Sequence, residues 1–82
     1  MDIRLLRYFL AVAREENISR AAKTLHISQP TLSRQLMELE RELNSQLFLR
    51  SSGNRRVVLT AEGVLLRKRA EEILDLVART ES

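Results

Sequence analysis

The spacing of hydrophobic residues predicts two helices at the start of the chain. Over residues 3–16, apolar side chains form one stripe at helical spacing: Ile3, Leu6, Leu10 and Ala13, with Leu5, Phe9 and Val12 beside them. Asp2 is a suitable N-cap for this helix. A shorter helix is predicted from Arg20 to about Leu25, with Ser19 as its N-cap and two alanines that let another helix approach closely.

A third helix is predicted from Gln29, after a break at His26 and Ile27. Ser28 is its N-cap, and Pro30 is tolerated because first-turn amides have no helical partner to lose. Its apolar positions repeat at helical spacing: Leu32, Leu36, Leu39 and Leu43. The opposite face near the helix start is small or polar and holds no acidic residue: Gln29, Thr31, Ser33, Arg34 and Gln35.

Beyond residue 46 the pattern changes from helical to extended. Residues 47–50 and 56–59 predict two short strands around the turn-rich segment 51–54, and so a β-hairpin with arginines at its stem and tip. Thr60 then caps a final helix, predicted from Ala61 to about Ala78. Its apolar stripe again has helical spacing: Leu66, Ala70, Ile73 and Val77, widened by Leu65 and Leu74.

Composition restricts the class of protein. The 82 residues suffice for one small domain, and 44% hydrophobic with 30% charged residues is typical of a soluble globular protein. No apolar run approaches the ~20 residues of a membrane span, and the chain start, with Asp2 and Arg7, does not resemble a signal peptide. The absence of cysteine excludes disulfides and thiolate metal sites, and we expect an intracellular, cytoplasmic location.

The distribution of charge is more informative than the net charge of +3. Two segments, 17–37 and 43–61, contain no acidic residue and three basic residues each. These basic residues are Arg20, Lys23 and Arg34 in the first segment, and Arg50, Arg55 and Arg56 in the second. A single surface built from both segments would suit a polyanion such as DNA.

Two short helices joined by a tight turn, the second with a polar and acid-free start, are typical of a helix-turn-helix. Such a helix enters a major groove about 12 Å wide, where compact side chains form hydrogen bonds with base edges. The arginine-bearing hairpin that follows resembles a wing that rests on the phosphate backbone or in the minor groove. We therefore expect a mainly α fold, with a winged helix-turn-helix over residues 1–59 and a long linker and dimerisation helix over residues 60–82.

Four sequence segments closely resemble the DNA-binding region of the LysR-type transcriptional regulators. They are residues 6–9 (Leu-Arg-Tyr-Phe), 19–35 (from Ser-Arg-Ala-Ala to Ser-Arg-Gln), 47–50 (Leu-Phe-Leu-Arg) and 59–63 (Leu-Thr-Ala-Glu-Gly). The resemblance implies a bacterial regulator, associated with the nucleoid, that binds DNA as a homodimer. It also implies a larger effector-binding domain outside this chain. Between Arg50 and Leu59 the chain is somewhat longer than is usual in the family, which leaves open whether Arg55 or Arg56 takes the wing-tip role.

The candidate DNA-binding residues combine the polar start of the third helix with the arginines of the hairpin. They are Ser28, Gln29, Pro30, Thr31, Ser33, Arg34, Arg50, Arg55 and Arg56. Arg34 and Gln29 are the candidates for base edges, because arginine and glutamine form paired hydrogen bonds with guanine and adenine. The hydroxyl residues of the set are candidates for phosphate contacts. We expect Arg34→Ala to reduce specificity and Arg55→Ala to reduce affinity evenly across sequences.

The apolar stripe of the final helix predicts a homodimer. The predicted contacts are Leu66, Ala70, Ile73, Leu74 and Val77. The three-helix core is expected to cover only part of this stripe, and pairing with a second copy would remove the rest from water. Two alternatives remain open. The stripe packs only on its own domain, against Leu5, Leu6 and Phe9, or it binds a different protein while the basic segments merely aid solubility.

No group of residues indicates an enzyme or a metal site. His26 is the only histidine, and no second ligand accompanies it. No pair of acid–base groups lies in a segment that would form a pocket. We therefore expect no catalytic residue, no metal and no cofactor, and we expect any small-molecule effector to bind only the domain outside this chain.

Overall fold

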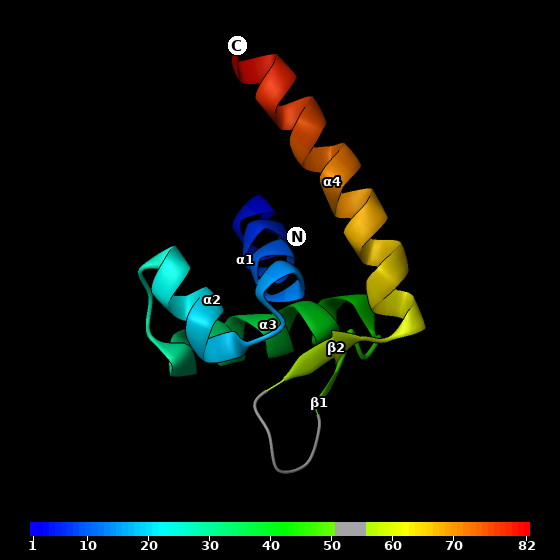
Figure 1. Ribbon diagram of the computed structural model, residues 1–82. Helices are drawn as coiled ribbons and strands as arrows, with labels where there is room; N and C mark the ends of the chain where they lie inside the picture. The colour runs from blue at the N-terminus through cyan, green and yellow to red at the C-terminus, as the bar shows by residue number, and fades with distance from the viewer. Residues whose placement is uncertain (51–55) are drawn as a thin grey trace.

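The computed structural model describes residues 1–50 and 56–82, which form four helices and one two-stranded antiparallel sheet (Figure 1). The elements follow in the order α1 (Ile3–Glu15), α2 (Ile18–Leu25), α3 (Gln29–Leu43), β1 (Phe48–Arg50), β2 (Val57–Leu59) and α4 (Ala61–Glu81). This is the mainly α fold that the sequence predicts, with α4 three residues longer than expected at its C-terminal end.

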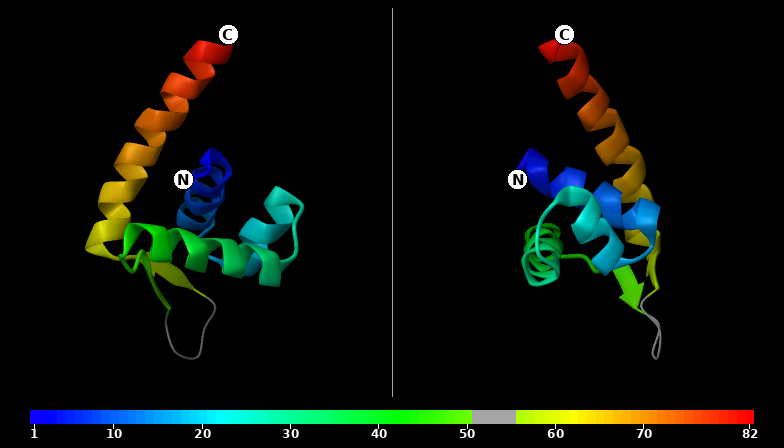
Figure 2. Two further views of the ribbon diagram at one scale, coloured as in Figure 1. Left: turned by 180° about the vertical axis from the view of Figure 1, so that it is seen from behind. Right: turned by 60° about the vertical axis from the view of Figure 1, so that its left-hand side comes forward.

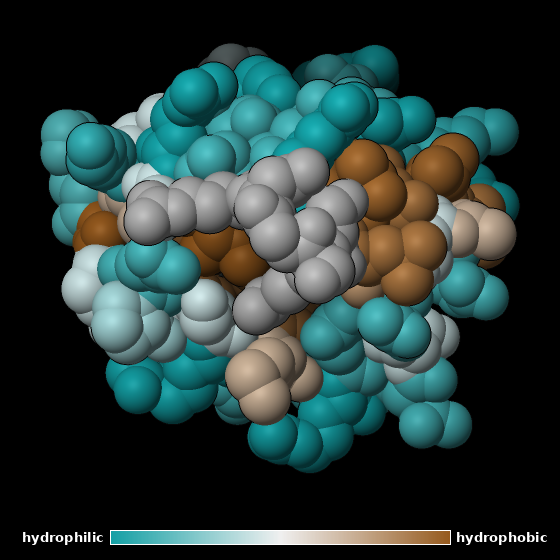
Figure 3. Space-filling view, turned by 60° about the horizontal axis from the view of Figure 1, so that its bottom comes forward, coloured by the Kyte–Doolittle hydropathy of each residue, from teal (hydrophilic) through white to brown (hydrophobic). Residues whose placement is uncertain are grey.

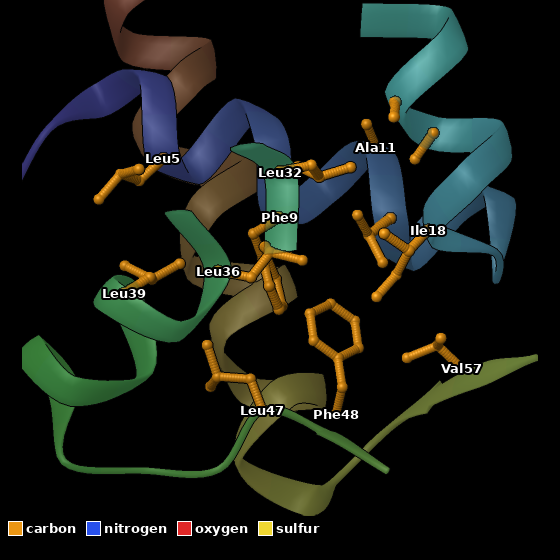
Figure 4. Packing of buried hydrophobic residues seen from close by; sticks show 13 residues of the cluster. Leu5, Phe9, Ala11, Ile18, Leu32, Leu36, Leu39, Leu47, Phe48 and Val57 are labelled. Atoms are coloured by element: carbon orange, nitrogen blue, oxygen red, sulfur yellow. The ribbon is translucent and has the colours of Figure 1, made fainter. Parts of the chain in front are cut away.

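The first three helices and the hairpin enclose one hydrophobic core (Figure 4). The three helices contribute most of the predicted apolar positions, and Phe9 and Leu32 are completely buried. Ile3, predicted in the first stripe, is instead exposed in the first turn of α1, beyond the edge of the core. The hairpin closes the core from below with Phe48, whose ring centroid lies 5.3 Å from that of Phe9. Among the described residues no polar or charged side chain is buried, so apolar packing stabilises the interior.

Three of the four predicted N-caps are confirmed: Asp2, Ser28 and Thr60 each accept a hydrogen bond from a first-turn amide of the helix that follows. The prediction for α2 was wrong. Its N-cap is Asn17, whose Oδ1 accepts from the backbone N–H of Arg20 at 2.8 Å, and Ser19 lies inside the helix. Ile18 forms the first helical residue because its side chain is buried in the core, which moves the helix start before Ser19.

The hairpin is held against the end of α1. Its strands pair Phe48 with Leu59 and Arg50 with Val57, and each begins one residue later than predicted. The N–H of Val57 donates to the carbonyl of Glu16 at 3.1 Å, and Asn17 and Arg56 form an isolated bridge. The start of β2 is therefore fixed by backbone hydrogen bonds to the α1–α2 junction.

Helix α4 begins against the hairpin and then leaves the rest of the molecule. The N–H of Thr60 donates to the Leu47 carbonyl at 3.0 Å, and the Thr60 hydroxyl donates to the Gln46 carbonyl at 2.7 Å. Beyond its contact with α1, the distal half of α4 projects away from the three-helix core (Figure 2). In the described part of the chain, no helix is both long enough and apolar enough to cross a membrane.

Candidate nucleic-acid interface

The turn between α2 and α3 is three residues long and closed by local hydrogen bonds. Helix α2 ends at His26, which has a left-handed backbone (φ 61°) and donates its N–H to Lys23 at 3.1 Å. Ile27 donates to Ala22 at 3.0 Å, and its half-buried side chain packs against the core. Ser28 then caps α3, so the relative placement of the two helices is set within a few residues.

The start of α3 presents the polar face that the sequence predicts. Gln29, Pro30 and Arg34 are exposed, whereas Thr31 and Ser33 are half-buried. Leu32, on the opposite side, is completely buried in the core. Five of the predicted site residues therefore lie together on the first turns of one helix.

The hydroxyl groups at this helix start already have local partners. The Ser28 Oγ accepts from the N–H of Thr31 at 3.2 Å and donates to the Thr31 Oγ1 at 2.8 Å. Ser28 is therefore first of all the cap of α3, and its remaining hydrogen-bonding capacity is limited.

Gln29 is held by a residue that the sequence analysis did not include in the site. The Ser19 Oγ of α2 donates a hydrogen bond to the Gln29 Oε1 at 2.9 Å. No spacing rule predicts this contact, because the two residues belong to different helices and lie ten positions apart. Only the close packing of α2 on α3 brings them together.

Three basic residues of the helix-turn-helix are exposed and lack a charged partner. These are Arg20 and Lys23 on α2 and Arg34 on α3. None of them forms an ion pair with any residue that the structure describes. Their charge is therefore available to an anion rather than neutralised within the molecule.

The arginines of the hairpin differ in how far they are described. Arg56 is exposed, and its Nη2 lies 3.5 Å from the Glu16 Oε1, so one carboxylate partly compensates its charge. The backbone of Arg50 belongs to β1, opposite Val57. The side chain of Arg50 and the whole of Arg55 lie outside the described part of the chain, and the predictions for them stay predictions.

The start of α3 and the hairpin lie on the same side of the molecule, opposite the distal half of α4 (Figures 1 and 2). Figure 3 shows this face from below. Hydrophobic side chains gather on the side where the hairpin meets α4, and mostly hydrophilic or intermediate side chains cover the rest. The hairpin itself contributes Leu49, which is 50% exposed.

The predicted dimerisation residues divide into two groups along α4. Leu66 packs against the core of its own chain, and Ala70 is completely buried, so within one chain Ala70 has no surface left for a partner. Ile73, Leu74 and Val77 are only half-buried. Together with Leu76, which is 60% exposed, Ile73 and Val77 line a shallow apolar hollow near the end of the helix.

His26 is exposed at the end of α2, where it closes the helix. Within residues 1–50 and 56–82 there is no cluster of three or more side chains suited to hold a metal ion. The structure therefore assigns His26 a capping role.

The fold defined by these elements is a winged helix-turn-helix, with a tight α2–α3 turn, an antiparallel hairpin and a long helix behind it. Residues 3–64 match the family described as bacterial regulatory helix-turn-helix proteins of the lysR family. The match covers most of the chain, and the chain therefore belongs to the LysR family, a class of DNA-binding transcription regulators. This membership confirms the resemblance found in the sequence, and the similar proteins are transcription regulators rather than enzymes.

Relatives in two bacteria are similar over most of this chain. The HTH-type transcriptional regulator BsdA of Bacillus subtilis (strain 168) is 54% identical over 74 residues, which are 90% of this chain and 25% of BsdA. The regulator XapR of Escherichia coli (strain K12) is 51% identical over 73 residues, which are 89% of this chain and 24% of XapR. The chain spans about a quarter of the length of these relatives.

Two solved structures have nearly the same fold. The crystal structure of the CbnR DBD–DNA complex has a TM-score of 0.93 and 43% identity, covering 99% of this chain and 91% of that chain. The BenM DBD in complex with catB site 1 DNA has a TM-score of 0.90 and 44% identity, covering 98% of this chain and 87% of that chain. Both of those proteins were crystallised with DNA.

Proposed function

We propose that this chain binds double-stranded DNA, with the start of α3 in a major groove and the β-hairpin on the adjacent backbone or minor groove. The observation that supports this most is the placement of the exposed, acid-free start of α3 on the same side as the hairpin (Figure 1). Arg34 adds an uncompensated charge to this side. Phosphate contacts would supply affinity, and base contacts would supply specificity.

Within this interface, Arg34 and Gln29 are the proposed contacts to base edges. Both are exposed on the first turns of α3. The planar guanidinium of Arg34 can donate two hydrogen bonds to the O6 and N7 of guanine, and the amide of Gln29 can pair with adenine. The half-buried hydroxyls of Thr31 and Ser33 are better placed for phosphate oxygens at the edge of the groove.

Arg34→Ala tests this assignment, with Arg41→Ala as the matched control. Both arginines are exposed on α3, but Arg41 lies in the last turn, away from the proposed contact. The preferred duplex is first selected from a random pool. We expect Arg34→Ala to lower the ratio of the affinity for the selected duplex to that for the scrambled duplex by about 5- to 150-fold, which corresponds to the ~1–3 kcal/mol of one bidentate contact. Arg41→Ala should leave this ratio unchanged. An equal loss on both duplexes with Arg34→Ala would refute the base contact.

We further propose that two copies pair through the distal half of α4. An apolar surface that includes Leu76 and the half-buried Ile73 and Val77 is costly to leave in water. A two-fold dimer would place two α3 helices on half-sites about one helical turn of DNA apart, or a multiple of that, and would favour an interrupted palindrome. The biological role that follows is transcription regulation in the bacterial cytoplasm, at the nucleoid. A small-molecule effector would act through a domain outside this chain.

The competing proposal is a protein-interaction domain whose α4 stripe binds a different partner. The dependence of binding on salt concentration distinguishes the DNA-binding proposal from the protein-interaction proposal. Neutralising phosphates with arginine and lysine releases counterions, so the logarithm of the DNA association constant falls linearly with the logarithm of the salt concentration. Association through the apolar face of α4 would respond little to salt.

A further inference from the structure

The hydrogen bond from Ser19 to Gln29 connects the two helices of the helix-turn-helix at the proposed DNA surface. The donor is the Ser19 Oγ in the first turn of α2, and the acceptor is the Gln29 Oε1 at the first residue of α3, at 2.9 Å. Across the described residues, no other hydrogen bond joins the side chains of two different helices. Ser19 is half-buried and Gln29 is exposed, so the contact lies at the surface of the molecule.

Ser19 lies within the first turn of α2 and does not cap that helix. Asn17 performs that function through its bond to the N–H of Arg20. A capping serine would use its oxygen as an acceptor for a first-turn amide. As the second helical residue, Ser19 instead directs its hydroxyl toward α3.

The bond restrains a side chain that would otherwise be free. Glutamine has three side-chain torsions, and ordering such a side chain costs conformational entropy. A contact that is ordered before DNA arrives avoids part of that cost on binding. In this bond the Oε1 end of the amide faces Ser19. With Oε1 engaged by Ser19, the Nε2 group has no partner within the described residues and remains as a donor.

We infer that Ser19 is a positioning residue that sets the base preference of Gln29 by fixing the orientation of its amide. The inference rests on the proposed DNA-binding function. The restrained amide offers its NH₂ group to a hydrogen-bond acceptor in the major groove, such as the N7 of a purine. Without the Ser19 hydroxyl the amide turns freely and offers either its donor or its acceptor end, so the preference at that base position broadens.

Selection from a random duplex pool tests this inference with the 82-residue chain and three variants. Ser19→Ala removes the hydroxyl, Ser19→Thr retains it, and Thr24→Ala is the matched control, because the Thr24 hydroxyl bonds only to the Arg20 carbonyl of its own helix. We expect Ser19→Ala to reduce the preference at one base position by about two- to tenfold, the range of one neutral hydrogen bond. Ser19→Thr and Thr24→Ala should retain the preference, and binding to scrambled duplex should be unchanged in all three.

Repeating Ser19→Ala in a Gln29→Ala background distinguishes an effect of Ser19 on the orientation of Gln29 from a general effect on the structure. If Ser19 acts through Gln29, the second substitution adds no further loss of preference. The same loss in both backgrounds would overturn the inference, as would an equal weakening on selected and scrambled duplex. If the proposed DNA-binding function is wrong, the unsubstituted chain will bind no duplex. That result would refute the inference together with the proposed function.

Discussion

At the scale of single residues, Arg34 and Gln29 are both exposed on the first turns of α3 but are restrained differently. Arg34 is exposed without an ion-pair partner among the described residues, whereas Gln29 is bonded to Ser19. A free arginine can adapt to the phosphate or base that it meets, and a held glutamine can accept only a narrow set of partners. Within this account, Arg34 contributes both attraction and discrimination, and Gln29 contributes discrimination alone.

The exposed face of α3 could be predicted from the sequence, but the partners of its side chains could not. Helical periodicity assigns Arg34 to the side opposite the buried Leu32, and both Arg34 and Gln29 are exposed in the structure. The bonds from Ser19 to Gln29 and between Glu16 and Arg56 depend on how elements pack across each other. Periodicity within one element contains no information about that packing.

Gly63 gives a prediction in which packing opposes helix propensity. A Cβ built at Gly63 would lie 2.3 Å from the Leu47 carbonyl oxygen, which belongs to the backbone and cannot rotate away. Propensity alone favours alanine over glycine within a helix by about 1 kcal/mol. We expect Gly63→Ala instead to lower the free energy of unfolding by roughly 1–3 kcal/mol, as overpacking does. Denaturant unfolding measures this change, and a stabilised variant would show that α4 does not pack closely on Leu47.

At the scale of elements, the start of a helix can be predicted from the sequence where only one residue nearby is a good N-cap. Asp2, Ser28 and Thr60 each precede an apolar stripe and were predicted correctly. Near α2, both Asn17 and Ser19 are good N-cap types, and the sequence rule does not choose between them. The burial of Ile18 decides for Asn17, because an apolar first residue has to reach the core.

Asn17→Ala and Ser19→Ala form a matched pair that tests this boundary. Asn17→Ala removes the acceptor for the Arg20 N–H, and we expect the free energy of unfolding to fall by about 1 kcal/mol. Ser19→Ala breaks only a neutral, solvent-accessible bond and should change stability by less than about 0.5 kcal/mol. Thermal unfolding monitored by circular dichroism compares the two variants. A larger loss of stability for Ser19→Ala than for Asn17→Ala would indicate that Ser19 is the N-cap of α2.

The long helix α4 shows where a stripe of apolar residues is ambiguous. The sequence gives one continuous stripe, but the structure divides it, because Leu66 and Ala70 pack within the chain while Ile73 and Val77 remain half-exposed. Periodicity predicts that an apolar face is buried, but it does not show whether the same chain or a second copy covers it. The distal half is therefore the part on which the proposed dimer depends.

At the scale of the whole molecule, Leu76→Glu tests the proposed pairing. Leu76 is 60% exposed in the single chain, so a carboxylate there should not disturb folding but would be buried without a partner in a dimer. Lys68→Glu is the control, since it places a carboxylate at an exposed position on the side of α4 opposite its apolar stripe. We expect sedimentation at micromolar concentration to show a dimer for the unsubstituted chain and for Lys68→Glu, and a monomer for Leu76→Glu. A monomer for the unsubstituted chain throughout this range would contradict the proposal.

The molecule separates the proposed DNA-contacting surface from the proposed pairing surface. The start of α3 and the hairpin lie together at one end, and the exposed half of α4 projects at the other (Figures 1 and 2). Backbone bonds from Val57 to Glu16 and from Thr60 to Leu47 hold the hairpin between the helix-turn-helix and α4. A change in how two copies pair would therefore alter the spacing of the two proposed DNA-contacting ends without altering either end itself.

The amide chemical shifts of the isotope-labelled chain, followed while its selected duplex is added, report which residues contact DNA. Our account predicts the largest changes over residues 28–35 at the start of α3 and in the two strands of the hairpin, and small changes over residues 72–81 of α4. Raising the salt concentration should reverse these changes. Changes concentrated on α4 or at the C-terminal end of α3, with residues 28–35 unaffected, would contradict the proposed interface.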